Sequence, residues 1–149
     1  MRFINPILMW VVVVLGAVGI WFTIPYHRTI QPDLINGICF GSACLTWMCW
    51  VYAGIKTHPE APKGVQKITE LKTTGPFALI RHPLYAGHIC FTWSFLLIFP
   101  SLRTGAIAAW LTLVLLLWAK LEEYGLIRIF GDSYLRYKEK TPMFIPRLW

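Results

Sequence analysis

A polar triplet interrupts the apolar sequence between residues 75 and 87, where the chain reads GPFALIRHPLYAG. Arg81, His82 and Tyr85 supply a guanidinium, an imidazole and a phenol, which can bind anions, exchange protons and donate hydrogen bonds. Pro83 is favourable in the first turn of a helix, because its missing N–H would have no partner there. We therefore expect this triplet at the start of a helix, either as a membrane-surface anchor or as part of a site.

A pair of carboxylates, Glu122 and Glu123, follows the last long apolar run. If the two helices run antiparallel, these carboxylates reach the same depth as Arg81, His82 and Tyr85. Taken singly, such residues most often anchor or solvate a helix end. Ionisable groups at the edge of a lipid layer are costly unless they are paired or used, so their convergence favours a functional site.

Long apolar runs, which we expect to form helices, must hold these two clusters in place. The chain has 149 residues, of which 56% are hydrophobic and 14% charged, a balance that is far from that of a soluble domain of this size. We predict an all-α integral membrane protein, a single membrane domain over 1–149, with about four transmembrane helices and a C-terminal interfacial amphipathic helix. The predicted helices cover approximately 4–26, 34–55, 83–102 and 104–122. The loop 56–82 and the segment 123–149 are expected to form the site.

Basic residues are distributed unevenly between the connections. The segment between the second and third runs holds five of the fourteen Lys and Arg residues, namely Lys56, Lys63, Lys67, Lys72 and Arg81. The region from residue 120 onward holds six, namely Lys120, Arg128, Arg136, Lys138, Lys140 and Arg147. The other two connections hold Arg28 and Arg103, and Arg2 precedes the first run. By the positive-inside rule, both termini and the site are predicted to be cytoplasmic.

The net charge of +7 is accounted for by this topology, and no soluble basic face indicates nucleic-acid binding. The four cysteines, Cys39, Cys44, Cys49 and Cys90, lie inside apolar runs without a CxxC pair. We expect them to be small buried apolar residues, not a disulfide framework or a metal site. The sequence does not define an oligomeric state.

Four ordered elements carry a family resemblance. LKTTGPFALIRHPLYAG, followed by LEEYGLIRIFGDSYLRYKEKTPMFIP, resembles the isoprenylcysteine carboxyl methyltransferase and phospholipid methyltransferase superfamily of integral membrane enzymes. The shared pattern is TxGPY/F, RHPxYxG, an EE pair and FGxxYxxYxxxxPxxIP, and it covers about the last half of the chain. The resemblance implies methyl transfer from S-adenosylmethionine to a lipid-soluble or membrane-embedded acceptor at the cytoplasmic face of the bilayer.

The resemblance also implies site residues. The cofactor contacts would be Thr69, Glu70, Leu71, Lys72, Phe77, His82, Pro83, Tyr85 and Glu122. Arg81 would brace the site by pairing with Glu123 or Glu122, or would orient an anionic acceptor. No protein nucleophile is needed, because methyl transfer depends mainly on positioning.

One departure from the family pattern concerns the acceptor. Prenylcysteine methyltransferases tend to carry an Arg one helical turn before the first Glu, where this chain has Trp118. An indole cannot pair with a carboxylate, so a neutral or amine-bearing acceptor is expected beside Trp118. The alternatives are an NADPH-dependent membrane reductase of the sterol-reductase type and a non-enzymatic membrane protein whose charged clusters only anchor helix ends.

Overall fold

The computed structural model describes residues 5–146 of the chain. Arg2, Arg147 and the outer ends of the expected ranges 4–26 and 123–149 lie outside these residues. The described part is all-helical and contains no strand. The α-helices are α1 (Pro6–Thr23), α2 (Leu34–Thr57), α3 (Pro76–Leu79), α4 (Pro83–Ser94), α5 (Leu102–Phe130) and α6 (Asp132–Lys140). Single 3-10 turns cover Ala61–Lys63, Val65–Lys67 and Phe95–Leu97.

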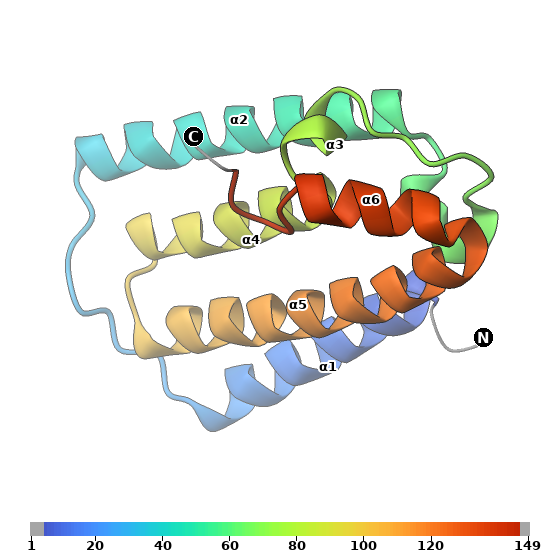
Figure 1. Ribbon diagram of the computed structural model, residues 1–149. Coiled ribbons are helices and arrows are strands. Elements are labelled where there is room, and N and C mark those ends of the chain that lie inside the picture. Colours follow the sequence, from blue (N-terminus) through green and yellow to red (C-terminus); the bar gives the residue numbers. More distant parts are fainter. Residues whose placement is uncertain (1–4, 147–149) are drawn as a thin grey trace.

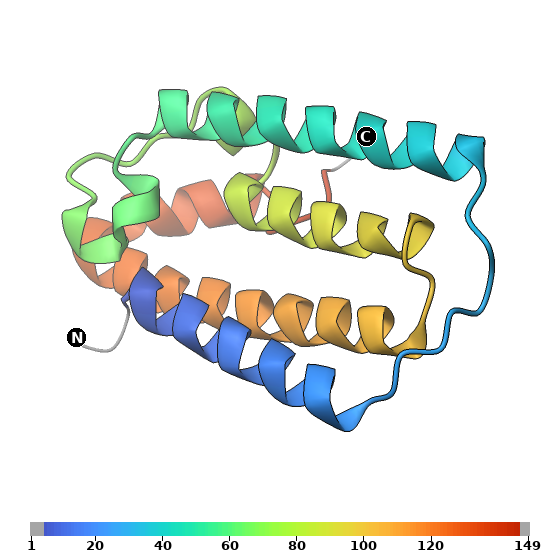
Figure 2. The ribbon, with the colours of Figure 1, turned by 180° about the vertical axis from the view of Figure 1, so that it is seen from behind.

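Four helices lie side by side in the order α2, α4, α5, α1 (Figures 1 and 2). The short helices α3 and α6 and the loop after α2 gather at the end where α2 and α5 finish and α1 and α4 begin (Figure 1). The connections α1–α2 and α4–α5 lie at the opposite end. All of the sequence elements with site chemistry therefore meet at one end of the bundle.

Local sequence signals explain where the long helices start. The side chain of Asn5 accepts a hydrogen bond from the Ile7 amide and caps α1. Asp33 and Asn36 cap α2 reciprocally, each side chain accepting from the other residue's backbone N–H. Ser101 caps α5 through its hydroxyl oxygen, which accepts a hydrogen bond from the Thr104 amide. Such caps satisfy N–H groups that have no partner within the helix.

Three helices, α1, α2 and α5, are long and apolar enough to cross a membrane. Their outer faces carry exposed apolar side chains such as Phe22 (83% exposed) and Leu34 (78% exposed). Helix α4 has 12 residues and rises about 18 Å, which is short of a hydrocarbon core of about 30 Å. A fourth span therefore remains a prediction.

Two expected helices have different ends in the structure. The third expected helix, 83–102, is interrupted after Ser94 by the turn Phe95–Leu97, and Pro100 and the Ser101 cap then begin a new helix. The fourth, expected over 104–122, continues to Phe130. It continues because residues 123–130 pack against α6 and the loop turns instead of separating from the bundle.

The core between α1 and α5 joins the motif-free N-terminal helix to the site-bearing helix. Its buried side chains include Met9 and Val13 from α1 and Leu115 and Trp118 from α5. A second cluster, formed by Val65, Leu126, Tyr134 and Tyr137, lies beneath the loop at the site end.

The cysteines are free, and most of them are not buried in the protein. Cys39, Cys49 and Cys90 are exposed, while Cys44 is half-buried. The expectation of burial was therefore wrong for three of them. Their apolar sequence context reflects helix faces directed away from the bundle, a distinction that composition alone does not make.

Candidate active site

The Arg-His-Pro triplet is held against the C-terminal segment that follows α6. The amide of Arg81 donates to the carbonyl of Pro142 at 2.9 Å, and the amide of His82 donates to the carbonyl of Met143 at 3.2 Å. His82 is the N-cap residue of α4, which begins at Pro83. The segment 142–143 thereby fixes the two side chains that precede the helix.

The first turn of α4 is also fixed from α2. The indole N–H of Trp50 donates to the carbonyl of Pro83 at 2.7 Å. Gly87 permits this close packing, because a Cβ there would lie 3.0 Å from the Trp50 ring. Helix α4 thus meets α2 through a contact that a larger residue at position 87 would disturb.

Arg81 forms a buried ionic network below the turn. Its Nε and Nη2 both lie 2.7 Å from Oε1 of Glu123, and Nη1 donates to the carbonyls of Lys138 and Thr141. Lys138 reaches the other carboxylate oxygen at 2.8 Å. The guanidinium and the Glu123 carboxylate are 8% and 6% exposed. This network joins the start of α4, α5 and the end of α6.

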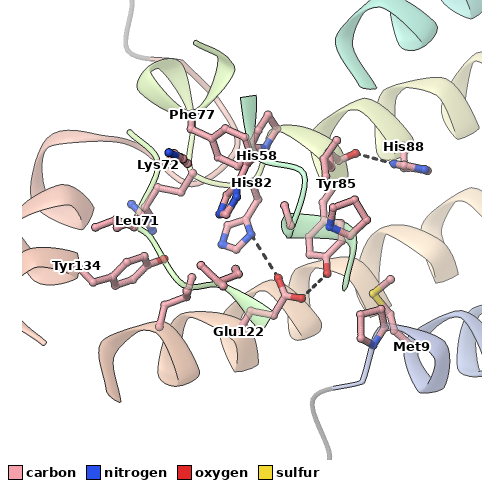
Figure 3. Close-up of a pocket in the computed structure, with 18 of the residues that line it drawn as sticks. Met9, His58, Leu71, Lys72, Phe77, His82, Tyr85, His88, Glu122 and Tyr134 are labelled. Carbon is pink, nitrogen blue, oxygen red and sulfur yellow. Dashed lines mark hydrogen bonds and ion pairs between the residues drawn. The ribbon is translucent and has the colours of Figure 1, made fainter. Parts of the chain in front are cut away.

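Glu122 has a different environment from its neighbour. Its Oε1 accepts a hydrogen bond from the Tyr85 hydroxyl at 2.8 Å, and its Oε2 lies 3.9 Å from Nδ1 of His82 (Figure 3). The His82 ring stacks between Tyr85 and Phe144. Burial lowers the pKa of His82 below its usual value, so the imidazole is neutral at physiological pH. A neutral imidazole leaves the Glu122 carboxylate without a full countercharge from His82.

Helix α6 adds two tyrosines from the end of the chain. Gly131 separates α5 from α6 with φ 53° and ψ −129°, a conformation that favours glycine. Tyr134 and Tyr137 follow on one face of α6. The hydroxyl of Tyr137 donates to the carbonyl of Phe77 at 2.6 Å, and burial raises its pKa to about 12. The hydroxyl of Tyr134 is buried and has no hydrogen-bond partner among the described residues.

These groups surround a cavity between α1, α4, α5, α6 and the loop (Figure 3). Of the side chains inferred from the sequence, those that line it are Leu71, Lys72, Phe77, Arg81, His82, Pro83, Tyr85 and Glu122. Thr69 and Glu70 line a neighbouring hollow instead, where Glu60 accepts from the Thr69 amide and Glu70 pairs with Lys72. The two hollows share His58 and Lys72.

Two inferred residues are not among those that line either hollow. Glu123 is covered by Arg81 and Lys138. Trp118 packs in the core between α1 and α5. A direct contact between Trp118 and an acceptor therefore remains a prediction.

Comparison with known proteins identifies the family. The family model described as phospholipid methyltransferase matches residues 35–133, about two thirds of the chain. This chain belongs to the phospholipid methyltransferase family. The matched range contains α2 to α5, including the Arg-His-Pro turn and both glutamates.

Named relatives support this membership. The chain is 35% identical to the protein-S-isoprenylcysteine O-methyltransferase of Schizosaccharomyces pombe over 78% of this chain and 49% of that protein. It is 28% identical to the methanethiol S-methyltransferase of Pseudomonas deceptionensis over 72% of this chain and 47% of that protein. The chain thus spans about half the length of these relatives. No solved structure matches it significantly.

Sequence reasoning missed several residues that line the cavity of this member of the phospholipid methyltransferase family. Met9 and Trp10 of α1 line the cavity, although α1 carries no motif. His58 and His88 also line it. Of these four residues, only His88 had a signal in the sequence, because it is an isolated histidine within an apolar run.

Proposed function

We propose that this chain binds S-adenosylmethionine in the cavity and transfers its methyl group to a lipid-soluble acceptor at the cytoplasmic face of the membrane. The observation that carries the proposal is the mixed lining of the cavity, where the polar side chains of His82, Glu122 and Tyr134 lie beside apolar Leu71 and Phe77. A concave site with a few polar groups in an apolar lining suits a ligand that has both polar groups and a flat apolar part. Membership of a methyltransferase family supports S-adenosylmethionine as this ligand.

The donor groups of the cavity fit this cofactor. The Glu122 side chain offers a hydrogen-bond acceptor for the amino group or the ribose hydroxyls of the ligand. His82 and Tyr134 offer polar contacts, and Phe77 with Leu71 provides an apolar slot suited to a flat base. When bound, S-adenosylmethionine supplies an electrophilic methyl group on a sulfonium.

The protein's own contribution is mainly positioning. Bringing an acceptor and a methyl donor together in line can supply roughly 7 to 11 kcal/mol of the barrier. The Arg81–Glu123 network holds the turn before α4, and the stacked pair His82 and Tyr85 lies on that turn. Such fixed side chains are what an in-line transfer requires.

Two tyrosine variants test the cofactor site. Tyr134→Phe removes a buried hydroxyl from a residue of the cavity wall, so we expect weaker S-adenosylmethionine binding with little change in thermal stability. Tyr137→Phe removes the bond to the Phe77 carbonyl, so we expect a stability loss of about 0.5 to 1.5 kcal/mol. Calorimetric titration in detergent measures binding. Wild-type protein that binds NADPH and not S-adenosylmethionine would refute the proposal.

The charge of the cavity gives a second test. Glu122→Gln should weaken S-adenosylmethionine binding by about 1.5 to 3 kcal/mol, because it removes a charge-assisted hydrogen bond. Glu139→Gln on the exposed face of α6 is the matched control and should bind normally. Equal affinity in the two folded variants would remove Glu122 from the cofactor site.

A further inference from the structure

An imidazole lies deeper in the cavity than the polar turn. His88 is five residues after Pro83 on α4, about 7.5 Å further along the helix axis. His82, Tyr85 and His88 are spaced by three residues and all line the cavity, with His88 furthest from the His82 end (Figure 3). If the His82 and Glu122 level marks the membrane interface, His88 is on the hydrocarbon side. Ionisable residues at such depth usually have a function.

The hydrogen bonding of His88 defines its tautomer. Nδ1 lies 2.6 Å from the carbonyl oxygen of Leu84. A carbonyl can only accept, so Nδ1 carries a proton, and in the singly protonated ring the Nε2 lone pair can accept a hydrogen bond. Within residues 5–146 no group donates a hydrogen bond to Nε2. The rings of Trp10 and Trp47 contact the imidazole at centroid distances of 5.4 and 5.7 Å and hold its plane.

The cavity wall near His88 is apolar, with Met9 and Trp10 from α1 and Leu84 from α4. The cationic side chains that line the described cavity are already paired, Arg81 with Glu123 and Lys72 with Glu70. An anionic carboxylate acceptor would therefore find no free cation in that part of the chain. From the elements packed around α4, the titratable groups that share the cavity are His58, Lys72, Glu122, Tyr134 and Tyr137.

We propose that His88 selects an uncharged, apolar acceptor bearing a thiol or hydroxyl group, by accepting the hydrogen bond of that group at Nε2 and then taking its proton. This inference rests on the proposed function. The acceptor's sulfur or oxygen forms the new bond to the methyl carbon. The electron pair of the broken carbon–sulfur bond stays on the donor sulfur, which becomes a neutral thioether. The acceptor proton moves to Nε2, and the positive charge passes to the imidazolium.

A proton acceptor is chemically useful for this class of nucleophile. A thiol has a pKa of about 8.5 and is mostly protonated at neutral pH, while its thiolate is the reactive form. A carboxylate is already ionised and needs no base. A positioned general base typically contributes 10²- to 10⁴-fold in rate.

Two substitutions separate binding from proton transfer. His88→Gln keeps a hydrogen-bond acceptor without a base, and His88→Phe keeps a ring without either. With decanethiol as the probe, we expect His88→Gln to retain thiol binding within about threefold while its kcat falls at least about 100-fold at pH 7. We expect His88→Phe to lose binding as well, by about two- to tenfold. Thiol binding is measured without S-adenosylmethionine, and His27→Gln at the opposite end is the control.

The pH profile gives a readout that a structural role would not alter. In wild-type protein kcat should rise with pH as the base loses its proton, and in His88→Gln this ascending limb should move toward the thiol pKa of about 8.5. An unchanged limb in His88→Gln would overturn the inference, and so would a limb near pH 8.5 in the wild-type protein.

The acceptor panel distinguishes this inference from the proposed function. Decanethiol, decanol and decanoate share chain length and differ in the reacting group. Methylation of decanoate with no effect of His88→Gln would overturn the inference and leave the methyltransferase proposal intact. Failure of the wild-type protein to bind S-adenosylmethionine would overturn both.

Discussion

Adjacent carboxylates have different partners in this site. Glu123 is saturated by Arg81 and Lys138, so both of its oxygens are occupied by the protein. Glu122 has a single close donor, the Tyr85 hydroxyl, and lines the cavity. Successive residues on a helix point about 100° apart, which lets one glutamate brace the fold while its neighbour faces a ligand.

The buried pair predicts a stability asymmetry. Arg81→Ala leaves the buried Glu123 carboxylate with Lys138 alone and should destabilise the protein by about 3 to 5 kcal/mol. Combining Arg81→Ala with Glu123→Gln should recover part of that loss, because the uncompensated charge is gone. Lys138→Met is the control: its side chain is 41% exposed and should cost less than about 1 kcal/mol. Unfolding in detergent measures all three, and equal losses for Arg81→Ala and Lys138→Met would contradict the network.

The buried histidines predict the direction of pH dependence. Burial lowers the folded-state pKa of His82 and of His58, so between that value and the unfolded pKa of about 6.5 the unfolded state binds more protons. The contribution of each histidine to stability is therefore complete above pH 6.5 and falls as the pH drops below it, by at most about 1.4 kcal/mol per pH unit. Thermal unfolding between pH 7.5 and 5.5 measures this slope. Relative to wild type, His82→Asn should lose less stability on acidification, whereas the exposed His27→Asn should behave as wild type; the same pH dependence in wild type and His82→Asn would disprove the reasoning.

At the scale of elements, the length of α5 sets the depth of the site. Glu122 is 20 residues after Leu102, which corresponds to about 30 Å along the helix and to the thickness of a hydrocarbon core. The rest of α5, to Phe130, extends past that boundary and supports α6. One helix is thereby long enough both to cross a membrane and to support the site.

The junction between α5 and α6 predicts contrasting glycine effects. At Gly131 a Cβ meets no atom within 4 Å, so Gly131→Ala acts only through its positive φ and should cost about 1 to 3 kcal/mol. At Gly105, inside α5, a Cβ also meets nothing within 4 Å and the φ is not positive, so Gly105→Ala should be neutral or stabilise by up to about 1 kcal/mol. Thermal unfolding of both variants provides the measurement, and a destabilised Gly105→Ala with an unaffected Gly131→Ala would reverse the assignment.

Sequence patterns identified the parts of this site that depend on residues close together in the chain. Pro83 accounts for the start of α4, and the Glu122–Glu123 pair marks the depth at which α5 meets that start. Patterns do not reveal which side chain is left without a partner after packing, as Tyr134 is, or that Trp10 from a helix without a motif reaches the cavity. These features arise from contacts between distant segments, which leave no periodicity in the sequence.

At the scale of the whole molecule, the two ends of the bundle differ in chemistry. One end carries the loop after α2, α3, α6 and the cavity (Figure 1). At the other end, hydrogen bonds join the connections to each other and to α5: Thr29 donates to the Pro100 carbonyl, and Arg103 donates to the Ile24 carbonyl. Arg103 also lies over the Trp21 ring at 4.6 Å. An aromatic and a cation together are typical of a membrane interface.

This polarity predicts the orientation of the molecule in a bilayer. In a background without native cysteines, single cysteines at Lys63 and Lys140 should react with a membrane-impermeant reagent only from the cytoplasmic side, because basic connections remain there. Cysteines at Arg28 and Leu102 should react only from the opposite side. All four positions are exposed in the structure, so a failure to react could not be caused by burial within the protein. Labelling of Lys63 and Arg28 from one face would contradict the membrane-spanning arrangement, whereas a clean reversal of all four would keep the bundle and place the cavity on the outer face.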